Sequence, residues 1–309
     1  MNKTNSGKVV TLSENQVLEV SLPSNPSTGY AWQVVDNRDQ IISQIGTWDW
    51  VSDRADDAVG SWGNQITRFT GVSKGTTILK MVYARPWEDA EPLDEYSITI
   101  TNEGRYKGSY KPAEPLPTEE YAPTEKGRAL PSSFSWISQG GCTPCMNQGS
   151  CGSCWACAAV GSFECNIKII DKVTKRLSEQ WFVDCDNTYN GCSGGWCPFD
   201  HFQTSGAVYG ADYSYTGTEG TCKTNITFRE KIDSYKQISS GIASVDQIKE
   251  AIYNYGPVWT SVYSGSSINN YSGGIMTTNE SGNVNHAICL VGWNDNNGTN
   301  GYFILRNSW

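Results

Sequence analysis

The stretch Gln148-Gly-Ser-Cys151-Gly-Ser-Cys154-Trp155 decides how the second half of this sequence is interpreted. Small residues stand immediately before an apolar run with helical spacing, so we expect Cys154 at the N-terminus of a helix that continues to about Ile170. The dipole at that end favours a thiolate, which is the form of cysteine that attacks carbonyl carbons. The free N–H groups there can also receive the oxyanion formed on attack, and Gln148 can add a side-chain donor. The stretch therefore predicts a nucleophilic cysteine, Cys154.

The same stretch resembles the active-site cysteine region of the papain and cathepsin family, whose signature is followed by His and Asn roughly 130–150 residues downstream. The matching contexts are Asn285-His286-Ala287 and Arg306-Asn307-Ser308-Trp309. The resemblance implies that His286 takes the proton from Cys154 and later protonates the leaving amine. It also implies that Asn307 orients the imidazole and that Trp309 shields this hydrogen bond from water. The only other histidine is His201, so the choice of base is nearly forced.

The segment Gly191-Cys192-Ser193-Gly194-Gly195 resembles the family loop whose backbone pairs with extended substrate, because glycine lets a peptide approach the main chain closely. A plain turn is the alternative. The candidate substrate-binding residues implied by the resemblance are Gly194, Gly195, Trp196, Cys197, Ala287 and Trp309. The resemblance further implies two disulfides, Cys151–Cys192 and Cys185–Cys222.

The chain has 11 cysteines, and all of them lie at or after Cys142. A half of the chain this rich in cysteine contains disulfides, binds a metal or carries a reactive thiol. Zinc is a poor interpretation because the chain has only 2 His and no repeated CxxC pair, so we expect no metal and no cofactor. The pairing of six cysteines stays open: Cys142, Cys145, Cys157, Cys165, Cys197 and Cys289. We expect Cys289 to be a buried free thiol, and Cys142-Thr-Pro-Cys145 to be an extra staple rather than a redox pair.

Composition excludes two classes of partner. The net charge of −9 argues against nucleic-acid binding, which needs basic patches. No apolar run approaches the ~18 residues of a membrane helix. Disulfides point to a secreted or lysosome- or vacuole-like oxidising compartment, although the start MNKTNSGKVV lacks the apolar core of a signal peptide.

Residues 1–103 have an all-β pattern. Strand-like stretches at Val17–Leu22, Thr76–Tyr83 and Tyr96–Thr101 are separated by clusters of Gly, Pro, Asn and Ser. A small immunoglobulin-like β-sandwich is the expected fold.

Three loops of this part resemble those of the chagasin-type inhibitors of papain-like proteases, which present three loops to the protease cleft. The loops comprise Asn25, Pro26, Ser27, Thr28, Gly29 and Tyr30; Gly60, Ser61, Trp62 and Gly63; and Arg85, Pro86 and Trp87. An unrelated adhesive or carbohydrate-binding sandwich is the alternative.

Residues 104–128 contain four prolines among polar residues, which predicts an extended linker, with an ordered segment lying on one of the domains as the alternative. From residue 129 to 309 we expect an α+β domain of two lobes, with helices first and strands later. The expected elements are helices at Cys154–Ile170 and Ser178–Cys185, a helix capped by Ser244 and Gln247 that ends at Gly256-Pro257, and strands at Val258–Tyr263, His286–Trp293 and Tyr302–Arg306.

These features together predict a cysteine endopeptidase that hydrolyses peptide bonds of peptide or protein substrates through a thioester. Because no long helical propeptide precedes Leu130, we expect the chagasin-like domain to act on papain-like proteases in cis or in trans, including its own peptidase domain. The family continues beyond Trp309, so the resemblance implies a truncated C-terminus. The alternatives are an inhibitor whose incomplete peptidase half is inactive and an adhesive sandwich with a disulfide-rich tail.

Overall fold

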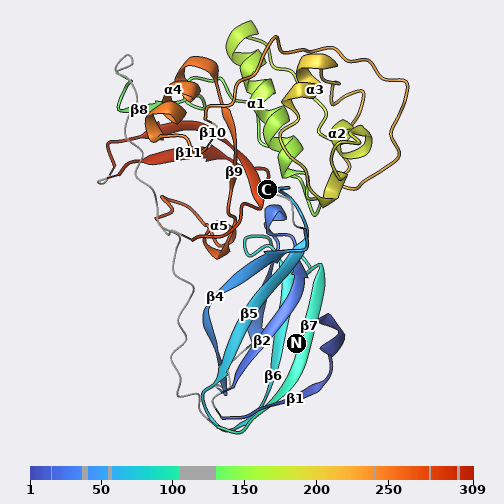
Figure 1. Ribbon diagram of the computed structural model, residues 1–309, viewed down its shortest axis with the longest axis vertical. Helices are drawn as coiled ribbons and strands as arrows, with labels where there is room; N and C mark the ends of the chain where they lie inside the picture. Colours follow the sequence, from blue (N-terminus) through green and yellow to red (C-terminus); the bar gives the residue numbers. More distant parts are fainter. Residues whose placement is uncertain are drawn as a thin grey trace. The chain divides into compact units, whose positions relative to one another are not determined.

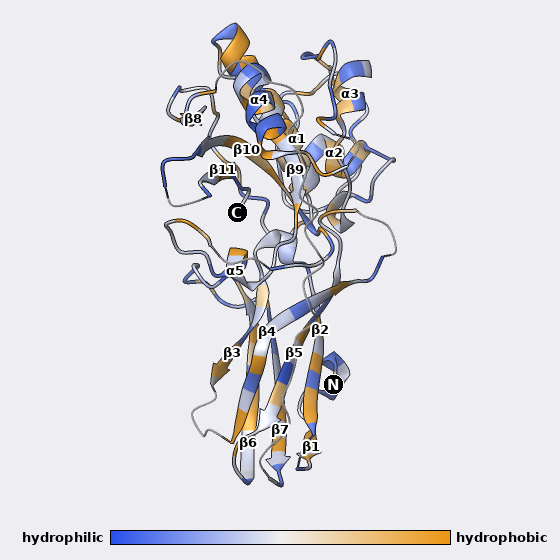
Figure 2. Ribbon diagram, turned by 60° about the vertical axis from the view of Figure 1, so that its left-hand side comes forward, coloured by the Kyte–Doolittle hydropathy of each residue, from blue (hydrophilic) through white to orange (hydrophobic). Residues whose placement is uncertain are grey.

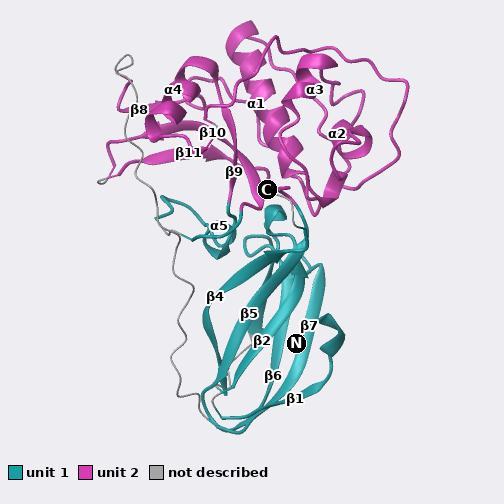
Figure 3. Ribbon diagram, in the orientation of Figure 1, with its two compact units in different colours: residues 1–57, 61–116, 263–283 teal, residues 58–60, 117–262, 284–309 magenta. Residues whose placement is uncertain are grey.

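The computed structural model describes residues 1–14, 16–36, 41–54, 58–104, 130–239, 241–277, 280–297 and 300–309. Contacts divide the chain into two compact units, coloured separately in Figure 3. The first comprises residues 1–57, 61–116 and 263–283, and the second comprises residues 58–60, 117–262 and 284–309. Three residues centred on Val59 therefore belong with the second unit. The predicted linker lies outside the described residues except for Gly104.

The first unit contains two β-sheets (Figure 1). One sheet has the order β1 (Val9–Leu12), β7 (Asp94–Asn102), β6 (Gly75–Ala84) and β3 (Ala31–Asp36). The other has the order β2 (Val17–Ser24), β5 (Gly63–Gly71) and β4 (Ile42–Ser52). β1 runs parallel to β7, and the other neighbours are antiparallel. The unit also contains the short helices η1 (Lys3–Asn5), η2 (Pro26–Thr28) and α5 (Ser266–Asn269).

Alternation of side chains explains why these sequences form a sandwich. Every second residue of β5 is buried, and β2 has a similar pattern; the alternation of apolar and polar residues is visible along the strands in Figure 2. The buried side chains form one core that includes Leu22, Phe69, Leu79, Tyr96 and Ile98. Each such residue contributes about 1.5–3 kcal/mol by burial. The all-β prediction and its three strands are confirmed, each strand being slightly longer than expected.

The helices of the second unit are α1 (Cys154–Asp171), α2 (Gln180–Cys185), α3 (Phe199–Thr204), α4 (Val245–Tyr255) and η3 (Gly191–Ser193). α1 is the core helix, because nearly all of its first three turns are buried. α4 begins with the predicted capping box: the Gln247 backbone N–H donates to the Ser244 hydroxyl, and the Ser244 N–H donates to the Gln247 side chain. The α3 helix was not predicted, since its six residues are too few to show a period.

The sheet of the second unit is centred on β10 (His286–Asn294). Its first half pairs with β9 (Val258–Val262), its second half pairs with β8 (Ser133–Ser135), and β11 (Tyr302–Arg306) runs antiparallel along the other edge. α1 packs against β10, where the Cys289 thiol donates to the Ala158 carbonyl at 2.9 Å. Apart from the short β8, helices therefore precede strands, as predicted. Within the described residues, no helix is both long and apolar enough to cross a membrane.

Candidate active site

Cys154 is the first residue of α1 and is fully buried. The residue before it, Ser153, occupies the capping position, but its side chain does not cap the helix. Its hydroxyl instead pairs with the Tyr215 hydroxyl at 2.6 Å. That side chain therefore does not take the N–H groups of the first turn, while the Ala156 and Cys157 N–H groups donate to the Ser153 carbonyl at 3.0 Å. The predicted position of Cys154 at a helix N-terminus is confirmed.

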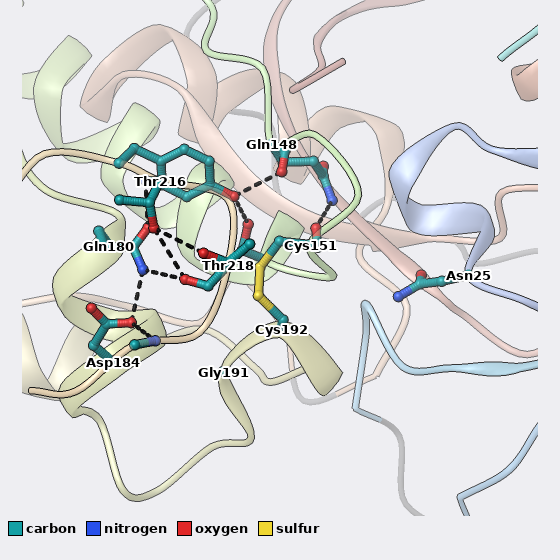
Figure 4. Close-up of a disulfide and its surroundings, with 12 residues drawn as sticks. Asn25, Gln148, Cys151, Gln180, Asp184, Gly191, Cys192, Thr216 and Thr218 are labelled. Atoms are coloured by element: carbon teal, nitrogen blue, oxygen red, sulfur yellow. Dashed lines mark hydrogen bonds between the residues drawn. A yellow bond between two sulfur atoms is a disulfide. The ribbon is translucent and has the colours of Figure 1, made fainter. Parts of the chain in front are cut away.

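Gln148 is held in place by four hydrogen bonds, of which the one to the Cys151 carbonyl can be followed in Figure 4. Its backbone N–H donates to the Ser308 carbonyl at 2.8 Å, its side-chain oxygen accepts from the Ser308 hydroxyl at 2.6 Å, and its carbonyl accepts from the Tyr215 hydroxyl at 2.8 Å. Its side-chain nitrogen donates to the Cys151 carbonyl at 3.0 Å. A primary amide carries two N–H donors, and this bond uses one of them. Sequence alone did not identify Ser308 or Tyr215 as the residues that position this amide.

The second unit contains two disulfides. Cys151 is bonded to Cys192, with Cα atoms 4.6 Å apart, and Cys185 is bonded to Cys222. The first of these bonds, drawn in Figure 4, joins the segment before α1 to η3. Gly152 adds a backbone hydrogen bond to the Cys192 carbonyl at 3.0 Å. Both pairs are those implied by the family resemblance.

His286 begins β10, and Asn307 follows the last residue of β11. The two strands are antiparallel neighbours, and this register brings the residues after β11 alongside the start of β10. The imidazole Nε2 lies 2.7 Å from the Asn307 Oδ1, and the Trp309 indole stacks on the imidazole with ring centroids 5.1 Å apart. The Nδ1 atom is buried and has no hydrogen-bond partner among the described residues. Asn307 thus fixes one imidazole nitrogen, and the other remains available.

Burial decides the protonation of His286. Complete burial lowers the pKa of this imidazole to about 4, and the hydrogen bond with Asn307 opposes the effect only in part. The imidazole is therefore neutral near pH 7 and can accept a proton.

The packing of α1 on β10 brings Cys154 and His286 into one neighbourhood. The Cys289–Ala158 contact lies three residues after His286 and one helical turn after Cys154. Cys154 and Ala287 also belong to the same buried core. Residues separated by more than 130 positions in sequence are thus gathered by one helix–strand contact.

The glycines that follow η3 let another backbone segment approach this loop closely. Gly194 has a φ of 105°, which favours glycine, and a Cβ on Gly195 would lie 2.6 Å from the Trp155 ring. Gly195 exchanges two backbone hydrogen bonds with Val59, of 2.9 and 3.0 Å, in antiparallel fashion. An extended segment thus pairs with the glycine at the position where the resemblance implies pairing with substrate.

Gly60 lies directly beside Cys154. Its N–H donates to the Asn285 carbonyl at 2.9 Å. A Cβ built on it would stand 2.2 Å from the Gly152 carbonyl oxygen and 3.2 Å from the Cys154 sulfur. Its φ of 85° lies in the left-handed region, so the chain turns sharply at this residue. Sequence analysis included Gly60 in a loop but missed Val59, an apolar residue directly before it.

Val59 is completely buried in the core that contains Cys154.

Of the residues expected to contact substrate, Ala287 is buried in this core and half-buried Trp196 packs against it. Trp196 also meets Trp259 edge to face, with centroids 5.1 Å apart. Cys197 is a half-buried free thiol whose pKa is raised by burial. Trp259 was not predicted, because nothing in its local sequence separates it from an ordinary strand residue.

The predicted inhibitor loops gather at one end of the first unit. Ser24 pairs with Gly63, and Ala31 pairs with Ala84, so the loops that these strands bound leave the same edge. The Arg85 guanidinium donates to the Thr28 carbonyl at 2.9 and 2.7 Å, which ties the third loop to the first. The same guanidinium lies over the Tyr30 ring and pairs with Glu88 at 2.7 Å. Gly29 adopts a φ of 81°, in the left-handed region that favours glycine.

Seven cysteines form no disulfide in the structure: Cys142, Cys145, Cys154, Cys157, Cys165, Cys197 and Cys289. Cys289 is fully buried, as predicted. The expected staple between Cys142 and Cys145 is absent: neither cysteine forms a disulfide, Cys142 is half-buried and Cys145 is exposed. Over the described ranges, no three His, Cys, Asp or Glu side chains converge to hold a metal ion.

Comparison with known proteins gives two family matches. Residues 130–309 match the family model described as papain family cysteine protease, and residues 11–101 match the chagasin family peptidase inhibitor I42. A cathepsin L-like proteinase of Phaedon cochleariae is 35% identical over 189 residues, which cover 59% of this chain and 57% of that protein. Cathepsin K of Mus musculus is 34% identical over 196 residues, which cover 61% of this chain and 58% of that protein. The chain thus spans less than two thirds of these relatives.

Solved structures agree with the sequence relatives. The bromelain protease of Ananas comosus, solved in complex with the E64 inhibitor, superposes with a TM-score of 0.54 at 31% identity. The match covers 58% of this chain and 84% of that one.

Proposed function

This chain belongs to the papain family of cysteine proteases, and we propose that it is a cysteine endopeptidase in which Cys154 attacks the peptide carbonyl and His286 is the base. The observation that carries the proposal is the state of the His286 imidazole. Asn307 engages Nε2, while Nδ1 is buried without a hydrogen-bond partner in the described part of the chain. A base oriented through one nitrogen and open at the other is what a cysteine nucleophile requires.

The proposed reaction proceeds in two stages. Nδ1 of His286 takes the Cys154 proton, and the thiolate adds to the substrate carbonyl. The imidazolium then protonates the leaving amine, which leaves a thioester that water hydrolyses with His286 again acting as the base. The N–H groups at the start of α1 and the second amide N–H of Gln148 stabilise the oxyanion of each addition.

We further propose that Val59 and Gly60 hold this site in a blocked state, so that the chagasin-family domain regulates its own peptidase. The support is the pairing of Val59 with Gly195 and the closeness of Gly60 to the Cys154 sulfur. The left-handed φ of Gly60 turns the chain sharply beside the nucleophile. The domains proposed for this arrangement are 1–103 and 129–309, joined by 104–128.

The proposed partners are peptide or protein substrates and, through the chagasin-family domain, papain-like proteases in cis or in trans. The two disulfides favour a secreted or lysosome-like compartment.

Labelling with an irreversible epoxide thiol inhibitor tests the nucleophile. After the linker has been cut by a serine protease, the label should appear on Cys154 and should be lost in a Cys154→Ala chain. Cys157→Ala is the matched control, because Cys157 lies one turn away on α1 and burial raises its pKa. Label on Cys157, or equal labelling of the Cys154→Ala chain, would contradict the assignment.

Cutting the linker also tests the regulation. Hydrolysis of a fluorogenic peptide should rise after the cut, and equal rates before and after would rule out inhibition in cis. A Cys154→Ala chain that then slows a separate papain-like protease would support action in trans.

A further inference from the structure

The segment Cys142–Cys145 lies along one side of α1. The Lys168 ammonium donates to the Cys142 carbonyl at 2.8 Å, and the Thr143 hydroxyl donates to the Glu164 carboxylate at 2.7 Å. Cys165 stands between Glu164 and Lys168 on the helix, so both of these contacts bracket it. Two independent hydrogen bonds therefore hold Cys142 against the turn of α1 that carries Cys165.

The two thiols act on each other: their interaction raises the pKa of Cys142 well above its ordinary value and lowers the pKa of Cys165. Cys165 is fully buried, whereas Cys142 is half-buried and can be reached from solvent. The proposed catalytic reaction uses neither of them. They form a close pair of sulfurs, one accessible and one enclosed.

A buried cation stands beside the pair. Arg306 is 7% exposed, and its guanidinium donates to the Pro144 carbonyl at 2.8 Å and to the Thr143 hydroxyl at 3.3 Å. Its Nε atom has no hydrogen-bond partner among the described residues. The hydrogen bond from Cys142, assisted by Arg306, lowers the pKa of the Cys165 thiol to about 6. A thiolate at Cys165 is therefore stabilised by both neighbours.

The other nearby thiols are less suited to react. Cys289 donates its proton to the Ala158 carbonyl, and burial raises its pKa to about 12. Cys145 is exposed, and the thiol that chiefly raises the pKa of Cys142 is Cys165. Together with the two contacts to α1, this favours Cys165 as the partner of Cys142.

We propose that Cys142 and Cys165 form a third disulfide by exchange with a small disulfide such as oxidised glutathione. The pair loses one proton, and the proton that remains shifts from Cys142 to Cys165 as the accessible Cys142 sulfur attacks the external disulfide as a thiolate, forming a mixed disulfide and releasing one thiolate. That thiolate takes the Cys165 proton, and the resulting Cys165 thiolate attacks the Cys142 sulfur and displaces the second thiolate. Two protein thiols are oxidised, one disulfide is reduced to two thiols, and the protons pass to the released thiolates.

The new bond would join the segment that leads to Gln148 directly to the helix that begins at Cys154. It would close a loop of the chain from residue 142 to residue 165, which restricts the unfolded state. This bond is separate from the proposed catalysis and does not depend on it.

Peptide mapping of the full chain tests the proposal without any substitution. The protein is incubated with oxidised glutathione, free thiols are alkylated, and peptides are analysed by mass spectrometry without reduction. A linked pair of peptides containing Cys142 and Cys165 is expected. Alkylation of both cysteines while the peptides of Cys151 and Cys192 remain linked would overturn the proposal, as would a bond between Cys142 and Cys145 or a stable glutathione adduct on Cys142.

Two variants sharpen the test. Cys145→Ser should keep the link, because Cys145 takes no part, and loss of the link in this variant would count against the assignment. Glutathione should raise the Tm of the parent by about 5 °C. It should leave the Tm of Cys142→Ser unchanged; an equal rise in both proteins would show that the stabilising bond lies elsewhere.

Discussion

Val59 and Gly195 exchange two backbone hydrogen bonds of 3.0 and 2.9 Å, although 136 positions separate them in the sequence. The pairing places the next residue, Gly60, where an added Cβ would stand 3.2 Å from the Cys154 sulfur. It is the main support for the proposed blocked state, and the first prediction follows from it.

Gly60→Ala should release the blocked site. A methyl group at this position would stand 2.2 Å from the Gly152 carbonyl oxygen, so the segment must move away. We expect the rate of peptide hydrolysis by the uncut chain to rise at least tenfold. This factor corresponds to a loss of ~1.4 kcal/mol in the free energy that favours the blocked state over the open state. Gly7→Ala is the matched control, because its φ of 78° is similar and nothing lies within 4 Å of the added methyl. Equal activity of the two variants would refute the role of Gly60.

Gln148→Glu should reduce kcat by about 10²–10³-fold, the usual cost of removing an oxyanion donor. The substitution keeps an oxygen to accept from the Ser308 hydroxyl but removes both amide donors and adds a negative charge. The measurement is steady-state hydrolysis by the linker-cleaved enzyme. Gln203→Ala, at an exposed glutamine, serves as the control. A kcat within twofold of the parent would exclude Gln148 from the oxyanion site.

Acid should loosen the blocked state through His286. Burial lowers the pKa of its imidazole to about 4 from an ordinary 6.5, so the closed form holds the neutral ring. A group with a depressed pKa stabilises the folded, closed form above its ordinary pKa and loses that contribution as pH falls towards the depressed value. Opening is therefore favoured between pH 6.5 and 4, with each unit of pKa difference worth ~1.4 kcal/mol.

Hydrogen exchange measures this effect. The protection of the Gly60 and Gly195 amides, corrected for intrinsic rates, should fall as the pH is lowered through this range. The Val20 amide, in the sandwich strand β2, provides the comparison. Protection at Gly60 that follows Val20 at every pH would argue against the linkage.

Tyr215→Phe should lower the free energy of unfolding by about 1 kcal/mol, because its hydroxyl bridges the Gln148 carbonyl and the Ser153 hydroxyl. Denaturant unfolding of the linker-cleaved peptidase unit, and of the full chain, gives this value. The control is Tyr255→Phe, since Tyr255 is 73% exposed. If both substitutions cost the same, the bridge has no structural role.

Much of this fold was readable from local sequence. The capping box at Ser244, the alternation in β2 and the small residues before Cys154 are short-range patterns, and each predicted its element correctly. The short helix α3 and the bridging tyrosine Tyr215 were not predicted, because a six-residue helix shows no period and a lone tyrosine carries no signal.

By itself, the sequence determined the nucleophile candidate, the two sheets of the sandwich and the family to which the chain belongs, because these depend on patterns within a few residues or on motifs. Only the tertiary structure decided that Asn307 binds Nε2 of His286, that Cys142 meets Cys165 rather than Cys145, and that Val59 pairs with Gly195. Each of these contacts joins segments far apart in the chain. Their geometry is set by how strands align and helices pack, which no local pattern of residues encodes.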